Sequence, residues 1–244
     1  MESKLPFISV IIPVYNGATY LAEALDCVLG QQYRLLEIII IDDGSTDKTA
    51  EVADRFRGQL KYIYQENQGP AAARNHGLRV AGGELIAFLD ADDLWPDQTI
   101  QMMLEGLNKW PELEIILGLV QFMQTSAVNG QADRCFEKMG EPHLGYNLGC
   151  ALYRRSVFGR VGLFDETMRF SEDVDWFMRA REQGIAMALL ERVSLLYRRN
   201  QNSVTLGKDH HDLNFIKAFK RSLDRRRQFS PGLAQVMKMI PVIR

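Results

Sequence analysis

Short apolar runs alternate with helical patterns along the first half of the chain. The runs lack the polar alternation of a half-exposed strand, which is typical of parallel strands covered on both faces. They lie at 7–12, 38–41, 61–64 and 84–89, with helical patterns at 20–29, 49–56 and from Pro70 to the Gly82-Gly83 pair. This order predicts an α/β fold of parallel βαβ units with right-handed crossovers.

The pattern changes after a helix expected at 97–109. The second half combines strand-like segments with shorter helices and one polar, glycine-containing stretch at 125–141 that reads as a hairpin or an irregular loop. Strands are expected at 113–122, 148–153, 185–190 and 193–197, and helices at 156–161 and after Ser171. Neither internal repeats nor low-complexity tracts interrupt the chain.

The last segment, from residue 209, is helical and basic. Its Lys and Arg side chains alternate with Phe215, Ile216, Phe219 and Leu223. Such a helix can lie on an anionic membrane surface, and the alternative is a terminal helix packed on the domain with a solvated basic face. The tail at 236–243 is too short to span a bilayer, so it either docks on a partner or frays.

Composition narrows the class of protein. The 244 residues are 46% hydrophobic and 25% charged, as in an ordinary globular protein, and the net charge of −2 argues against a nucleic-acid binder. The three cysteines show no metal or disulfide spacing, which favours a reducing compartment. Because neither a signal peptide nor a spanning run is apparent, we expect a cytoplasmic protein, or one peripheral on the cytoplasmic face of a membrane.

The fourth strand pattern ends in three carboxylates within four residues, Asp90, Asp92 and Asp93. Carboxylates beside a diphosphate suit Mg²⁺ or Mn²⁺, and the alternative is a solvated acidic turn that caps the next helix. The first and second strand ends also carry polar groups. Because parallel strands end at one edge of the sheet, these groups can line one crevice. Neither a dinucleotide-binding Gly-x-Gly-x-x-Gly nor a phosphate loop with Gly-Lys-Ser/Thr is present.

Five stretches in this order and spacing resemble the family 2 glycosyltransferases of the GT-A fold. They are Val10–Gly17, Ile41–Asp47, Gly69–Asn75, Leu89–Asp93 and Ser171–Asp173. The resemblance covers about residues 5–205. It implies a Rossmann-like, mostly parallel central sheet flanked by helices, a nucleotide-diphosphate-sugar donor, a divalent metal (Mn²⁺ or Mg²⁺) and inversion at the anomeric carbon.

The resemblance also implies roles for residues on the donor side. Asp43 matches the base-binding aspartate, although it can instead cap the next helix. Tyr15 lies where the family offers an aromatic ring to the base, and the alternative is a half-buried tyrosine in a turn. Arg74 is expected to reach the nucleotide side of the pocket, with a salt bridge on the helix surface as the alternative. The remaining donor-side candidates from the matched stretches are Pro13, for backbone shape, together with Asn16 and Ala91.

Two further sets of residues carry the expected chemistry. Asp90-Ala91-Asp92 resembles the family's Asp-x-Asp, which implies that Asp92 is the principal metal ligand and that Asp90 and Asp93 share ribose and metal-water contacts. Asp173 resembles the catalytic base of the Glu-Asp pair, and Glu172 is expected either to shape the acceptor pocket or to support Asp173. The alternative for the pair is helix capping together with Ser171. The segment 198–203, which contains Arg198, loosely resembles the family's segment that closes over the diphosphate.

These assignments predict a catalytic domain at 1–208 and a basic helical extension at 209–244. Its nucleotide-binding half covers about 5–110 and its acceptor half about 111–208. The expected reaction moves a sugar, from UDP by preference, to a glycan or lipid-linked acceptor in polysaccharide, glycolipid or cell-envelope glycan synthesis. A non-catalytic nucleotide-sugar-binding or partner-binding module is the alternative. A nucleotidyltransferase is disfavoured, because such an enzyme needs a Gly-rich basic loop after the first strand and this sequence has none there. The sequence also allows a homo-oligomer.

Overall fold

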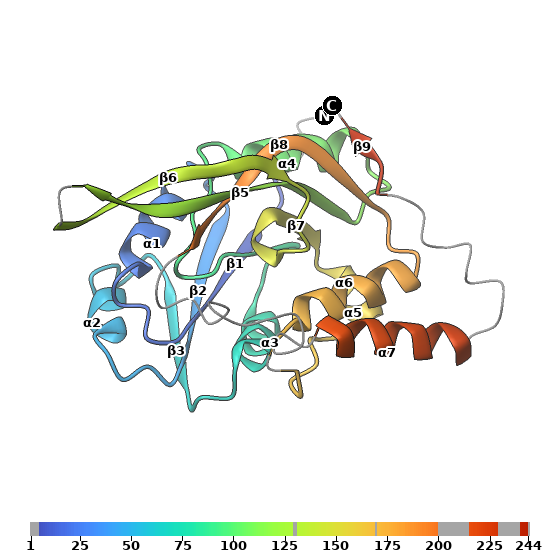
Figure 1. Ribbon diagram of the computed structural model, residues 1–244, viewed down its shortest axis with the longest axis horizontal. Helices are drawn as coiled ribbons and strands as arrows, with labels where there is room; N and C mark the ends of the chain where they lie inside the picture. Colours follow the sequence, from blue (N-terminus) through green and yellow to red (C-terminus); the bar gives the residue numbers. More distant parts are fainter. Residues whose placement is uncertain (1–4, 129–130, 169, 200–214, 229–239, 244) are drawn as a thin grey trace.

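One mixed β-sheet organises the chain (Figure 1). The computed structural model describes residues 5–128, 131–168, 170–199, 215–228 and 240–243. The sheet order is β3-β2-β1-β4-β7-β5-β8-β9, with β6 paired to the outer part of β5. Strands β1 to β4 are parallel, β7 is antiparallel to both neighbours, and β5, β8 and β9 are parallel to one another. The predicted α/β fold with a mostly parallel sheet is confirmed.

The elements have the following bounds. The strands are β1 Ile8–Val14, β2 Leu36–Asp43, β3 Lys61–Gln65, β4 Leu85–Phe88, β5 Ile115–Val128, β6 Gln131–His143, β7 Ala151–Arg154, β8 Met187–Arg199 and β9 Val242–Ile243. The helices are α1 Leu21–Leu29, α2 Thr49–Asp54, α3 Pro70–Val80, α4 Thr99–Lys109, α5 Ser156–Val161, α6 Glu172–Glu182 and α7 Phe215–Gln228, and a 3₁₀ turn covers Leu148–Cys150.

Several strands and the tail differ from the sequence prediction. The sequence predicts that strand β1 stops at Pro13, but the strand continues through it. The pairing of β1 with β4 ends at Ile11, so on that side Pro13 has no neighbouring strand to which an N–H would donate. The two strands expected at 185–190 and 193–197 are one strand, β8, which keeps its pairing to β5 across two register shifts. The end of the tail neither frays nor needs a partner, since β9 pairs with β8.

Helices cover both faces of the sheet. On one face, α3 lies so close to β1 that a Cβ on Gly77 would fall 2.4 Å from Cγ2 of Ile11. The same face carries a cluster of aromatic rings from β4, β7, α5 and α6, with centroids 4.9 to 6.3 Å apart. On the opposite face, Gly106 of α4 meets Ile116 of β5. Trp176 of α6 is fully buried in the aromatic cluster.

The basic helix α7 packs against α6 rather than standing apart (Figure 1). Ala218 is buried among Met168, Val174 and Met178, with Phe215 beside them. Within the described residues, no helix is long and apolar enough to cross a bilayer. Residues 209–214 and most of the tail at 236–243 lie outside the described part of the chain.

We expect Gly77→Ala to destabilise the protein by about 1–3 kcal/mol, because the added methyl group overpacks the contact of α3 with Ile11. The matched control is Gly159→Ala in α5, where an added Cβ has no heavy atom within 4 Å. There we expect about 0.5–1 kcal/mol of stabilisation from helix propensity. Urea unfolding measures both changes, and equal effects at the two glycines would contradict the close approach of α3 to β1.

Candidate active site

Three loops that follow parallel strands meet at one edge of the sheet. Val14 of β1 is in register with Asp42 of β2, and β4 ends beside Ile11. Asn16 joins the first two loops: its N–H donates to Oγ of Ser45 (2.8 Å), and its Oδ1 accepts the N–H of Thr46 (2.8 Å). Asn16 has a positive φ of 52°, which asparagine tolerates well. The expected single edge is therefore formed.

The buried carboxylate of Asp43 organises the loop between β3 and α3. Its Oδ1 accepts from Nε2 of Gln65 (2.7 Å) and from the N–H of Gln68 (2.9 Å), and its Oδ2 accepts from the N–H of Gly69 (2.8 Å). The first N–H of α2, that of Thr49, is bonded instead by Asp47, whose Oδ1 accepts it (3.0 Å). Asp43 thus shapes the place where a base contact is predicted.

Pro13 and Tyr15 lie on either side of the end of β1. Pro13 is a strand residue in register with Ile41, which fits its predicted role in backbone shape. Tyr15 is 55% exposed. An exposed ring beside the Asp43 loop offers a face for stacking.

Arg74 connects the two halves of the site. It is 7% exposed, and its Nη2 lies 2.7 Å from Oδ1 of Asp90, at the end of β4. Its Nη1 donates to Oε1 of Glu172, the first residue of α6. The alternative of a surface salt bridge is wrong, because the guanidinium is buried and holds two carboxylates from distant segments. The bridge brings Asp-x-Asp and Glu-Asp to one place.

The neighbour of Arg74, Asn75, fixes the loop that leads into α6. Its Oδ1 accepts the N–H of Phe164 (2.9 Å), and its Nδ2 donates to the carbonyl of Phe164 (2.9 Å) and to Oε1 of Glu166 (2.8 Å). Asn75 is fully buried in this clamp. The sequence analysis placed Asn75 in a matched stretch but gave it no role.

Asp173 lies in the first turn of α6, beside the buried pair of Glu172 and Arg74. It remains partly exposed, and its Oδ1 accepts the N–H of Val174 (2.7 Å). Ser171 makes no side-chain capping bond to the helix. Burial raises the pKa of Asp173 to about 7, the charge of Glu172 adds to that rise, and Arg74 opposes it. A carboxyl with this pKa is suited to proton transfer near neutral pH.

The acidic cluster after β4 is not one open set of ligands. Asp93 is buried and accepts the N–H of Arg198 (2.9 Å), and burial, followed by the charges of Asp92 and Asp90, raises its pKa well above the ordinary value. Ala91 is buried too, whereas Asp90 and Asp92 are partly exposed. Over the described ranges, no three His, Cys, Asp or Glu side chains converge as a metal site.

The chemistry of the donors still allows a divalent metal. Mg²⁺ and related hard cations are commonly held by one or two carboxylates together with substrate phosphates and water. Asp92 and Asp90 fit that description, whereas Asp93 faces the backbone of Arg198 instead. The three-carboxylate arrangement expected from the sequence is therefore reduced to two candidates.

Arg198 has a different place from the one expected. It belongs to β8, which runs to Arg199, and not to a segment that follows the last strand. The side chain is fully buried, donates to the carbonyl of Asp92 and to Glu23 of α1, and contacts the ring of Tyr20. Arg198 thus anchors the acidic loop after β4 to β8. The rest of the loosely matched segment, at 200–203, lies outside the described residues.

The comparisons with known proteins agree with this geometry. Residues 9–162 match the model of glycosyl transferase family 2, and the chain belongs to that family. A glycosyltransferase of Rickettsia typhi is 35% identical over 74% of this chain and 60% of its own length, and EpsJ of Bacillus subtilis is 30% identical over 82% and 63%. The chain thus spans about 60% of the length of these curated relatives.

Solved structures identify the fold. TarS of S. aureus, in complex with UDP-GlcNAc, matches with a TM-score of 0.68 at 21% identity, over 96% of this chain and 76% of that chain. The mannosyltransferase PcManGT of Pyrobaculum calidifontis, in complex with GDP-Man and Mn²⁺, gives a TM-score of 0.72 at 20% identity, over 91% and 65%. The fold is the GT-A fold, as predicted.

The raised pKa of Asp173 gives a pH-dependent prediction. In the unfolded chain the pKa of an aspartate carboxyl is about 3.9. Between about pH 4 and 7 the folded state therefore binds the extra proton, and stability is lost as the pH rises through this window. We expect Asp173→Asn to gain about 1–3 kcal/mol over the wild type at pH 8 and almost nothing at pH 4.

Urea unfolding at both pH values measures this difference. The control is Asp54→Asn, which removes a carboxylate that is 60% exposed at the end of α2. An advantage of Asp173→Asn that does not change with pH would show that Asp173 titrates normally in the folded protein.

Proposed function

We propose that the protein transfers a sugar from a nucleotide-diphosphate sugar to an acceptor hydroxyl, with inversion at the anomeric carbon. The observation that carries this proposal is the bridge through Arg74, which joins Asp90 to Glu172. It sets a candidate donor-phosphate site beside a candidate base, as a displacement reaction requires.

Support for the nucleotide comes from the loops after β1 and β2. The exposed ring of Tyr15 offers a stacking face to a base, and Asn16 and Asp43 hold the loops around it. We prefer UDP as the nucleotide, since TarS is in complex with UDP-GlcNAc. GDP is a second candidate, since PcManGT is in complex with GDP-Man.

We assign Asp92, together with Asp90, to a Mn²⁺ or Mg²⁺ ion that accompanies the donor. When bound, such an ion neutralises the charge that develops on the departing diphosphate. Arg74 contributes differently, because its two ion pairs hold Asp90 in place and neutralise part of the local negative charge.

We assign Asp173 as the general base. Its carboxylate takes the proton of the acceptor hydroxyl while the hydroxyl oxygen forms the new bond to the anomeric carbon and the bond to the diphosphate oxygen breaks. A pKa of about 7 leaves a substantial share of the carboxyl ionised at neutral pH and makes it a better base than an ordinary aspartate. Glu172 supports this role through its charge.

The acceptor and its setting belong to the same proposal. A glycan or a lipid-linked sugar of the cell envelope is the acceptor we favour. The free thiols of Cys27 and Cys150 agree with a reducing, cytoplasmic compartment. The competing function is a nucleotide-sugar-binding module without turnover, which would have no need of the raised pKa of Asp173.

We expect Asp173→Asn to lower transfer by about 10²–10⁴-fold while nucleotide binding is preserved, because an amide cannot accept the proton. Transfer is measured by nucleotide release with a panel of UDP, GDP and dTDP sugars, and Asp54→Asn serves as the control. Transfer that survives in Asp173→Asn would remove the assigned base. Binding without transfer in the wild type across the whole panel would favour the binding module.

We expect Asp92→Asn to abolish most of the metal-dependent stabilisation by the nucleotide. A ligand at 100 times its Kd stabilises the native state by about 2.7 kcal/mol, which a thermal shift detects. UDP, GDP, dTDP and CDP are compared with and without Mn²⁺, and the nucleotide alone is the internal control. A metal-dependent shift in Asp92→Asn equal to that of the wild type would refute the metal assignment.

A further inference from the structure

The outward side of α7 is a stripe of exposed apolar side chains. Ile216, Phe219 and Leu223 are 60%, 53% and 46% exposed. Their spacing of three and four residues places them on one side of the helix. Large apolar side chains in such a row are unusual on a free protein surface and indicate a surface that something else covers.

The inward side of α7 is fully committed to the domain. Ala218 and Ser222 are buried, and Oγ of Ser222 donates to Oε1 of Glu182 (2.5 Å). Arg225 pairs with Asp175 (3.0 Å) and with Glu182 (2.7 Å). Because these contacts fix the rotation of α7 about its axis, the apolar stripe cannot turn toward the core.

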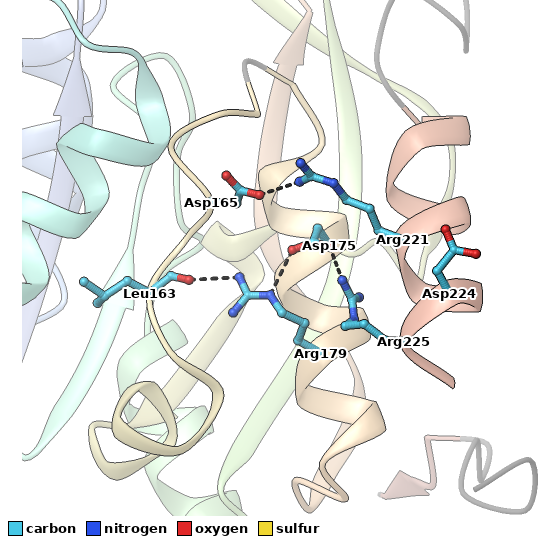
Figure 2. Close-up of a pocket in the computed structure, with 7 residues that line it drawn as sticks. All are labelled: Leu163, Asp165, Asp175, Arg179, Arg221, Asp224 and Arg225. Atoms are coloured by element: carbon cyan, nitrogen blue, oxygen red, sulfur yellow. Dashed lines mark hydrogen bonds and ion pairs between the residues drawn. The ribbon is translucent and has the colours of Figure 1, made fainter. Parts of the chain in front are cut away.

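Figure 2 shows the ion pairs of two arginines on this inward side and of Arg179 on α6. Arg221 pairs with Asp165, Arg225 pairs with Asp175, and Arg179 pairs with Asp175 and donates to the carbonyl of Leu163. These residues line a hollow of about 470 Å³ between α6, α7 and the preceding loop. Since each arginine has an acidic partner, the hollow needs no anionic ligand.

Three of the remaining basic residues of α7 face solvent. The helix holds six basic residues and one acidic residue, whereas the whole chain has a net charge of −2. With Arg221 and Arg225 paired inward, exposed positive charge comes from Lys217, Lys220 and Arg227. The acidic residue, Asp224, lies 3.9 Å from Arg227 and is half-exposed. The outer side therefore combines apolar contact with a local excess of positive charge.

We propose that this outer side of α7 binds an anionic lipid surface. A helix that is too short to span, with an apolar stripe and flanking cations, is the pattern of helices that lie in the headgroup region of a bilayer. The convex face of a single helix offers no groove for a peptide. The charge excess also matches the negative surface of anionic lipids.

The contact goes beyond the proposed transfer reaction, which needs no lipid surface. It also has a consequence for the site. Ala218 lies near Val174, and Ser222 lies near Glu182, so α6 and α7 run in roughly the same direction. The start of α7 is therefore close to the start of α6, where Asp173 lies. A lipid contact at the start of α7 would therefore be at the same end of this helix pair as the candidate base.

The test is sedimentation of the full chain with vesicles, without nucleotide. We expect binding to phosphatidylcholine vesicles that contain phosphatidylglycerol and little binding to phosphatidylcholine alone. The binding should fall at about 1 M salt, where the Debye length is about 3 Å. The double variant Lys220→Gln with Arg227→Gln should bind at least about tenfold more weakly, since each cation contributes about fivefold.

The apolar stripe is tested by Phe219→Ser with Leu223→Ser, for which we also expect at least a tenfold loss. Matched controls are Lys48→Gln with Arg57→Gln for charge, and Leu35→Ser for an exposed apolar side chain remote from α7. Both controls should bind as the wild type does, and circular dichroism checks the fold of every variant.

Equal binding to both kinds of vesicle, or none to either, would overturn the proposal. A stripe variant that binds like the wild type would overturn it too. A defined oligomer in light scattering that the stripe variant loses, without vesicle binding, would assign the surface to a protein partner instead. None of these outcomes depends on nucleotide or transfer, so this inference and the proposed function can fail separately.

Discussion

The buried guanidinium of Arg74 is the constraint on which the site depends. Taking the guanidinium and the carboxylate of Glu172 out of water is costly, and a buried ion pair persists only when the two charges meet in good geometry. Here the carboxylates come from the loop after β4 and the start of α6, so the bridge through α3 ties these two segments together. Loss of the guanidinium would leave Glu172 as an uncompensated buried charge, which is far more damaging than loss of a surface pair.

A second buried arginine acts on the same loop from the other side. Arg198 of β8 donates to the carbonyl of Asp92, while its own N–H donates to Asp93. The acidic loop is thus fixed between α3 and β8, and the two arginines offset the repulsion among its carboxylates. Asp92 and Asp173 are left partly exposed at the rim. Two buried cations therefore fix the acidic loop in place and leave these two carboxylates accessible from solvent.

Local sequence predicted the first half of the fold well, because continuous apolar runs followed by polar turns have few other interpretations. It failed where distance along the chain decides the structure. Arg74 and Glu172 are 98 residues apart, and Arg198 and Glu23 are 175 apart, so neither pair leaves a periodic signal. The roles of Asn75 and Glu23 were missed for the same reason. The single strand β8 was divided in two because its register shifts interrupt the apolar pattern that a regular strand would show.

The loop before α6 shows how these long-range contacts act together. Asn75 of α3 clamps it at Phe164, and Arg221 of α7 pairs with it at Asp165. The candidate base lies in the first turn of the next helix, so its position depends on both attachments. The contacts that fix α7 therefore also fix the loop that leads to Asp173, because Arg221 pairs with that loop and Arg225 pairs with α6. The basic helix is better regarded as a support of the site than as an appendage to it.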